Sequence, residues 1–262
     1  MHTPHQTKVS GTRTIVHEVN NNGSGARHFS LSANRVTKGL LVIIAIMLVF
    51  HIIALALELK LPPEEKLRRV ATQFFNFGHE ANFPTYFSAL ILLASSVLCF
   101  YISFAERNYR GNKNRHWQIL GFVFVFLSFD EAVQIHEQTM VVVHYLMPGL
   151  PSMLASAWVI PYALLAIAGG IYFLKFVISL PARTRNLFII SGGMFVAGAL
   201  GLEMVESYFN EKYGDVHVYS LMVFTLQELL EMVGITFFIY ALLDYISSFH
   251  KQSLITVNSG KL

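Results

Sequence analysis

Acidic side chains stand inside stretches of this sequence that are otherwise apolar enough to cross a membrane. The clearest case is FLSFDEAVQIHE (126–137), in which Asp130, Glu131, His136 and Glu137 follow directly on the apolar run WQILGFVFVFLSF. A charged group near a bilayer centre costs about 2.5–3.5 kcal/mol on insertion scales, and such groups commonly mark functional sites. Carboxylates and a histidine placed there could bind a metal ion, relay protons or act as general acids and bases.

Three further stretches place acids in a comparable way. GLEMVES holds Glu203 and Glu206, and LQELLEMVG holds Glu228 and Glu231, each pair three residues apart. Side chains at that spacing share one face of a helix. FGHEANFPTYFS adds Glu80 where another apolar segment begins. Acids from several segments are therefore expected at a similar depth.

The segment 117–137 is expected to form one continuous helix. Asp130 and Glu137 are seven residues apart, so they would share a face with about 10 Å between them at 1.5 Å rise per residue. Glu131 and His136 would each point away from that face.

Basic side chains that could neutralise these acids are missing from the same segments. Lys175, near the end of its segment, is the only Lys or Arg within them. Buried charges have to be paired, neutralised or bound to metal. Three arrangements therefore stay open, namely protonated carboxyls, a water-filled cavity open to the outside, and a bound metal ion.

A metal site is the interpretation we favour. The expected ligands are Glu80, Asp130, His136, Glu137, Glu203, Glu206, Glu228 and Glu231. Such a carboxylate-rich set with a histidine and no thiolate favours a divalent ion such as Fe, Mn or Zn over Cu(I). His51, by contrast, is interpreted as a hydrogen-bonded packing residue. Close helix packing is expected at the small residues Gly192, Gly193, Gly198 and Gly201.

The elements that must position these side chains follow from composition. Hydrophobic residues make up 54% and charged residues 13%, against about 25% charged in soluble domains, and the mean hydropathy is +0.50. Six apolar segments are long enough to span a bilayer and lack the alternation of strands. They cover residues 39–58, 84–104, 117–137, 152–178, 186–208 and 222–246. The predicted fold is an all-α membrane protein, a bundle of six transmembrane helices.

The distribution of Lys and Arg predicts the orientation. Fourteen of the 19 fall in the two tails and the two loops that would share one face, and five fall on the other. Since positive charge collects in the cytoplasm, both termini are expected there. The predicted organisation is a disordered cytoplasmic tail (1–36), a six-helix transmembrane domain (37–248) and a short cytoplasmic tail (249–262).

HEANFPTYFSALILL, FLSFDEAVQIHE and LQELLEMVG resemble the blocks of an uncharacterised group of bacterial multi-pass membrane proteins. The group's blocks read approximately E-x-N-x-P-T, L-S-x-D-E-x4-H-E and E-E-x2-E-M-x-G, and the resemblance covers most of residues 75–245. It implies an inner-membrane protein and supplies no activity. Gln227 stands where the group has Glu. The block members are Glu80, Asn82, Asp130, Glu131, His136, Glu137, Glu228 and Glu231.

Three functions are compatible with these features. The leading hypothesis is a buried metal site in the outer half of the bundle, with an unligated carboxylate as general base if the protein is an enzyme acting on a membrane-embedded substrate. The second is proton or cation transport through the same carboxylates. The third is a non-catalytic scaffold. We expect membrane lipids as partners and no nucleic acid, and a homo-oligomer stays open.

Overall fold

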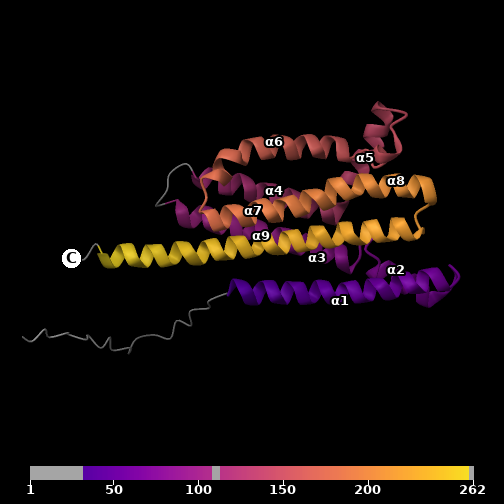
Figure 1. The fold of residues 1–262 in the computed structure, drawn as a ribbon, viewed down its shortest axis with the longest axis horizontal. Helices are drawn as coiled ribbons and strands as arrows, with labels where there is room; N and C mark the ends of the chain where they lie inside the picture. The colour runs from indigo at the N-terminus through magenta and orange to yellow at the C-terminus, as the bar shows by residue number, and fades with distance from the viewer. Residues whose placement is uncertain (1–31, 108–112, 260–262) are drawn as a thin grey trace, which may run out of the picture. The chain divides into compact units, whose positions relative to one another are not determined.

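The computed structural model describes residues 32–107 and 113–259, and each regular element in these ranges is a helix (Figure 1). The elements are α1 (Ala33–Lys60), α2 (Lys66–Phe75), α3 (Phe83–Glu106), α4 (Lys113–Val133), α5 (Ile135–Leu146), η1 (Ser152–Leu154), α6 (Val159–Ile178), α7 (Ala182–Val196), η2 (Ala197–Leu202), α8 (Glu203–Tyr213) and α9 (Val218–Ser259). Within the described residues, six helices are long and apolar enough to cross a membrane, which confirms the six predicted segments. The predicted tails over residues 1–31 and 260–262 lie outside the described residues.

The helix bounds differ from the sequence expectation in three places. The expected continuous helix over 117–137 is wrong, because α4 ends at Val133 and α5 begins at Ile135. The segment expected from residue 152 starts as the short 3-10 helix η1, and α6 begins only at Val159. Helix α9 continues to Ser259, past the predicted membrane boundary at residue 248.

Helix α9 lies at the centre of the helix packing. It contacts α1, α3, α7 and α8, and its Met232, Thr236, Ala241 and Leu242 side chains are fully buried. The start of α1 and the end of α9 lie at the same end of the bundle, and α2, α5 and α8 lie toward the other end (Figure 1). Because the number of long helices is even, the first of them begins at the same end of the bundle at which the last one ends.

Helices α3 and α4 form a close pair held by side-chain hydrogen bonds to backbone. The Ser96 hydroxyl donates to the Gly121 carbonyl at 2.9 Å, and the Ser128 hydroxyl donates to the Ala89 carbonyl at 2.8 Å. The ring of Phe100 lies against Gly121, where an added Cβ would come within 2.8 Å of it. Small residues thus let the two backbones approach closely.

A second close contact joins the α7–η2 segment to α9. A Cβ added at Gly198 would come within 2.8 Å of the Glu231 side chain and 3.0 Å of the Gln227 carbonyl oxygen. One added at Gly234 would meet the backbone of α7 at 3.0 Å. Gly198 therefore has the predicted packing role. Gly192, Gly193 and Gly201 do not, because a Cβ at any of them meets nothing within 4 Å.

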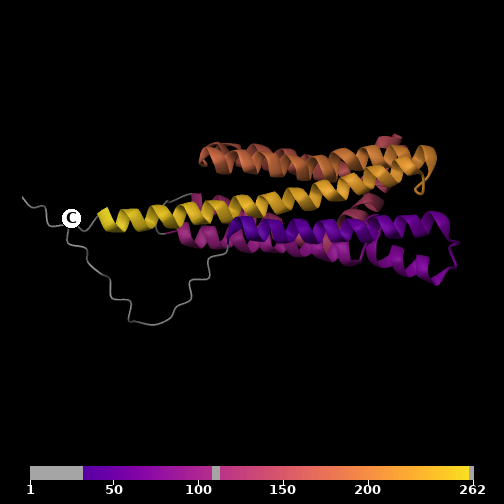
Figure 2. The same cartoon turned by 60° about the horizontal axis from the view of Figure 1, so that its bottom comes forward.

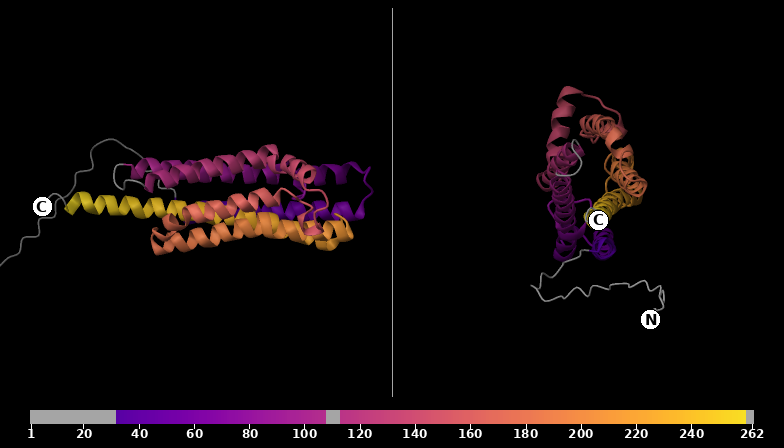
Figure 3. Two further views of the ribbon diagram at one scale, coloured as in Figure 1. Left: turned by 90° about the horizontal axis from the view of Figure 1, so that it is seen from above. Right: turned by 90° about the vertical axis from the view of Figure 1, so that its left-hand side faces the viewer.

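The helices stand in two groups when the bundle is turned or seen along its axis. Helices α3 and α4 lie on one side and α7 and α8 on the other, with α9 near where the two sides meet (Figures 2 and 3). Helix α6 packs loosely on α4 and α7, and only 11% of its most apolar 18-residue window is buried. The side chains that could do chemistry project between these two groups.

The contact at Gly198 can be tested by adding a single methyl group. Gly198→Ala should lower the free energy of unfolding by about 1–3 kcal/mol, because the methyl group would overlap backbone of α9. Gly201→Ala in the same η2 segment should be neutral or stabilising by up to about 1 kcal/mol, since its position is open and Gly is a poor helix former. Thermal unfolding in detergent measures both, and equal melting temperatures would contradict the close contact.

Candidate functional site

The site begins where the chain leaves α4. Gln134 has φ 61° and ψ 45°, a left-handed conformation that is uncommon for a residue with a side chain. The Asp130 carboxylate accepts a hydrogen bond from the His136 backbone N–H at 2.9 Å, so it satisfies one of the free amides at the start of α5. The expected relation of Asp130 and Glu137 on one straight helix is therefore wrong.

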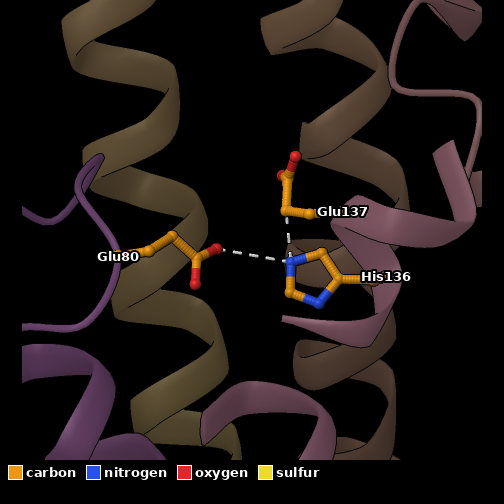
Figure 4. Close-up of side chains that lie close together, drawn as sticks. All are labelled: Glu80, His136 and Glu137. Atoms are coloured by element: carbon orange, nitrogen blue, oxygen red, sulfur yellow. Dashed lines mark ion pairs between the residues drawn. The ribbon is translucent and has the colours of Figure 1, made fainter. Parts of the chain in front are cut away.

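His136 lies between two carboxylates because of this turn. Its Nδ1 is 3.5 Å from Oδ1 of Asp130, and its Nε2 is 3.4 Å from Oε1 of Glu80 and 4.0 Å from Oε1 of Glu137 (Figure 4). Burial lowers the pKa of His136, but the carboxylates of Asp130 and Glu80 outweigh burial and raise it to about 10. In the absence of metal, His136 is therefore a cation that lies directly beside these acids.

Asp130 connects three helices. It is only 6% exposed, and the hydroxyl of Tyr162 in α6 donates to its Oδ1 at 2.9 Å. The Trp158 ring lies 5.1 Å from the His136 ring between centroids and 5.2 Å from that of Tyr162. These contacts join the start of α6 to the end of α4 and fix the orientation of the imidazole.

The loop that carries Glu80 is held by hydrogen bonds to its own backbone. The Asn82 amide donates to the Asn76 and His79 carbonyls, both at 2.7 Å, and its Oδ1 accepts from the Thr85 N–H at 3.0 Å. Asn82 therefore caps α3, and a proline stands in the first turn of that helix, as is common. Ala81, with φ 56°, completes a turn that directs Glu80 toward His136 (Figure 4).

The same loop is anchored to α1 and α9. His51 in α1 accepts a hydrogen bond from the Phe77 N–H at 3.1 Å, and its other ring nitrogen lies 2.9 Å from the Thr225 hydroxyl oxygen in α9. The Asn76 amide donates to Glu58 at 2.9 Å. His51 is thus a buried hydrogen-bonded packing residue, which confirms the sequence interpretation.

The other predicted acids come from α8 and α9, and those of α8 accept hydrogen bonds from side-chain amides. The Gln227 amide donates to Glu203 Oε2 at 2.7 Å, and the Asn210 amide donates to Glu206 Oε1 at 3.2 Å. Glu228 and Glu231 interact electrostatically with one another and with acids of the other helices. The acids predicted from separate segments therefore do come together.

All of these acids line one cavity of about 870 Å³. Its carboxylates are Glu80, Asp130, Glu131, Glu137, Glu203, Glu206, Glu228 and Glu231. The described residues that line it include His79 and His136 but neither Lys nor Arg. Carboxylates that are ionised in a partly apolar cavity require a positive partner.

Three members of the predicted ligand set lie close enough together to hold one metal ion. Glu80, His136 and Glu137 each offer a ligand atom, and these atoms lie within 4.8 Å of one another. Asp130 faces the other nitrogen of the same histidine. Glu203, Glu206, Glu228 and Glu231 line the cavity outside this group.

Three functional side chains were not predicted from the sequence. Tyr162 and Trp158 are aromatic residues at the start of an apolar segment, where aromatic side chains are common for reasons of packing alone. The sequence shows Gln227 only as a difference from the group's third block and indicates no contact for it. It donates to Glu203 because α8 and α9 lie side by side, and no spacing in the sequence indicates this pair.

Comparison with known families gives one match. A family described as "Domain of unknown function (DUF8692)" matches residues 39–245, which include the whole site. The chain belongs to this family. No curated protein and no solved structure matches the chain. Membership in DUF8692 agrees with the predicted resemblance to an uncharacterised group, and it assigns no activity.

The protonated state of His136 can be tested by pH. A group whose pKa is raised on folding stabilises the folded state fully below its unfolded pKa, about 6.5, and loses this contribution as pH rises through about 10. In metal-stripped protein, the advantage in melting temperature of wild type over His136→Gln should therefore be largest near pH 6 and shrink up to pH ~10. A difference that does not change over this interval would contradict the ion pairs with Asp130 and Glu80.

Proposed function

We propose that the chain is an integral multi-pass membrane protein that binds one divalent metal ion through Glu80, His136 and Glu137 and uses it on a membrane-embedded substrate. The observation that carries the proposal is the convergence of these three ligand atoms within 4.8 Å, at the polar end of the cavity. Fe, Mn or Zn fits such an oxygen-rich set with one imidazole.

The separations fit a metal coordination sphere. Ligands about 2.0–2.1 Å from a tetrahedral ion lie roughly 3.3–3.4 Å apart. The distance from His136 Nε2 to Glu80 Oε1 is 3.4 Å, and that to Glu137 Oε1 is 4.0 Å. A small rotation of Glu137, whose side chain is 42% exposed, would close the set.

Asp130 supplies the second feature that supports metal binding. Metal-bound histidines almost always use their other nitrogen to donate to a carboxylate or carbonyl, which fixes the tautomer and the ring orientation. Asp130 lies at Nδ1 of His136, is buried, and is itself fixed by Tyr162. The imidazole therefore presents Nε2 to Glu80 and Glu137.

Membrane insertion is supported by the surface of the helices. Large apolar side chains are exposed along α1 and α6, among them Ile46, Phe50, Leu164 and Ile171. Such surfaces are stable in lipid rather than in water. The biased distribution of Lys and Arg supports cytoplasmic termini, and the family resemblance supports the bacterial inner membrane.

A bound divalent ion would polarise a substrate oxygen or lower the pKa of a bound water molecule. Glu131 lies close enough to Glu80 and His136 to interact with them electrostatically and is outside the ligand group. It is therefore the carboxylate best placed to accept a proton from water at this site. The reaction class supported by this arrangement is metal-assisted attack of water on a membrane-embedded substrate.

Transport is less well supported by the cavity. A conducting path needs polar groups along its whole length, but the far end of the cavity is lined by Phe176, Phe188 and Phe238. The polar groups are concentrated at one end. This one-sidedness suits a binding or catalytic site.

Elemental analysis of purified protein tests the metal site. Wild type should contain about one equivalent of divalent metal, and His136→Ala should contain only background amounts, because the single nitrogen ligand is lost. Asp130→Asn should weaken metal affinity about 10–100-fold, as measured by competition with a chelator, since it removes the carboxylate that orients His136.

Glu211→Gln is the matched control. Glu211 is an exposed glutamate of α8 that does not line the cavity, so its replacement should leave metal content unchanged. Absence of metal from wild type, or equal metal in His136→Ala, would exclude this site.

A further inference from the structure

Most of the cavity is lined by apolar side chains rather than by the acids. From Glu228 to Phe238, its lining extends over ten residue steps of α9, or about 15 Å along the helix axis. This is half of the roughly 30 Å hydrocarbon core, the depth of one leaflet. Its volume of about 870 Å³ lies in the range of about 300–1,000 Å³ that holds one small ligand.

The apolar part of the cavity opens toward the side of the bundle. Phe122 of α4 is 66% exposed and Leu165 of α6 is 62% exposed, although both line the cavity. Val196 of α7 likewise lines it and is exposed. In a bilayer, large apolar side chains in this position face lipid, so a hydrocarbon chain can pass between the helices without crossing water.

Small residues leave room at the same level. Gly169 and Gly170 in α6 and Gly192 in α7 line the cavity, and a Cβ added to any of them would meet nothing within 4 Å. These glycines are not used for helix contact, unlike Gly198. Their effect is to widen the apolar part of the cavity.

The polar end holds an acceptor that lacks a donor. Gln227 is 7% exposed and lines the cavity, and its amide nitrogen donates to Glu203. Within the part of the chain that the structure describes, its buried Oε1 has no hydrogen-bond partner. A buried acceptor of this kind normally has a donor, and here it stands among Glu203, Glu228 and Glu231.

We propose that this cavity binds a single-chain amphiphile with a primary ammonium head group, whose hydrocarbon chain occupies the apolar part and whose head group lies among Gln227, Glu203, Glu228 and Glu231. This inference deepens the proposed function by naming the substrate class. A reaction of the amphiphile rests on the proposed metal site, whereas its binding does not. The ligand class follows from two features. The positive head group complements the acids, and the hydrocarbon chain complements the length of the apolar lining.

An ammonium group fits this end of the cavity better than other head groups. It has three N–H donors and a positive charge, so it can donate to Gln227 Oε1 and pair with neighbouring carboxylates. An anionic head group in this place would lie among Glu203, Glu228 and Glu231, and ionised carboxylates there would repel it. A neutral hydroxyl could satisfy Gln227 but would leave the carboxylates unpaired.

Native mass spectrometry of the purified protein tests the proposal. The probes are hexadecylamine, hexadecanol and hexadecanoic acid, which share one chain and differ in head group. The amine should bind as one adduct, at least about tenfold more tightly than the alcohol, and the acid should not bind. Binding of the amine should persist after chelator treatment, because its head group pairs with residues outside the metal ligand group.

Two adjacent glycines provide matched variants. Gly192→Leu should fill the cavity and abolish the amine adduct, whereas Gly193→Leu should retain it, because Gly193 has equally open space and does not line the cavity. Glu228→Gln, a substitution of nearly equal volume, should reduce the preference for amine over alcohol about tenfold. The Glu228→Gln variant keeps the proposal testable even if Gly192→Leu fails to fold.

Several results would overturn the proposal. These are equal binding of amine and acid, an adduct that survives in Gly192→Leu, an unchanged preference in Glu228→Gln, and loss of amine binding after chelation. Each of them can occur with metal content intact, which would leave the metal site standing. Amine binding by protein that contains no metal would support the ligand class and exclude the metal site.

Discussion

The contact of Asp130 with His136 is the constraint on which the rest of the site depends. One buried carboxylate accepts the backbone N–H that starts α5, faces the imidazole of the same residue and accepts the hydroxyl of Tyr162. The chain can leave α4 through a left-handed Gln134 because this carboxylate offsets the free amide. The same interaction returns His136 to the cavity and gives Glu80 a partner.

The helices and the acids can be predicted from the sequence, but the turn between α4 and α5 cannot. Apolar runs and charge bias are local properties, so the six long helices follow from composition, and Asn82 before a proline predicts the cap of α3. Gln134 has no such signal, because left-handed positions are usually Gly or Asn. Its conformation is stabilised by Asp130 and Tyr162, whose meeting is a property of the folded bundle. The role of the glycines in packing is likewise not predictable from local sequence, since only contact with α9 distinguishes Gly198 from Gly201.

Charge balance links the proposed metal site to the cavity. Eight carboxylates line the cavity, and His136 as imidazolium contacts the two that lie nearest to it and offsets one of their two negative charges. If a metal ion replaces the proton on Nε2, the polar end gains positive charge while His136 keeps its contact with Asp130. The carboxylates of α8 and α9 lie outside that exchange, and among the described residues the amides of Gln227 and Asn210 donate to the two in α8.

The short connection between α8 and α9 has a consequence for how the protein is made. Four residues, 214–217, separate the two helices, so the Glu203-bearing helix and the Gln227-bearing helix leave the ribosome one after the other. A lone helix carrying such acids would be poorly retained in lipid. A hairpin of α9 with α8 and the preceding η2 already contains the hydrogen bond from Gln227 to Glu203 and the close approach at Gly198. For a protein inserted during translation, this pair would therefore enter the bilayer as one unit, with its polar faces already turned toward each other.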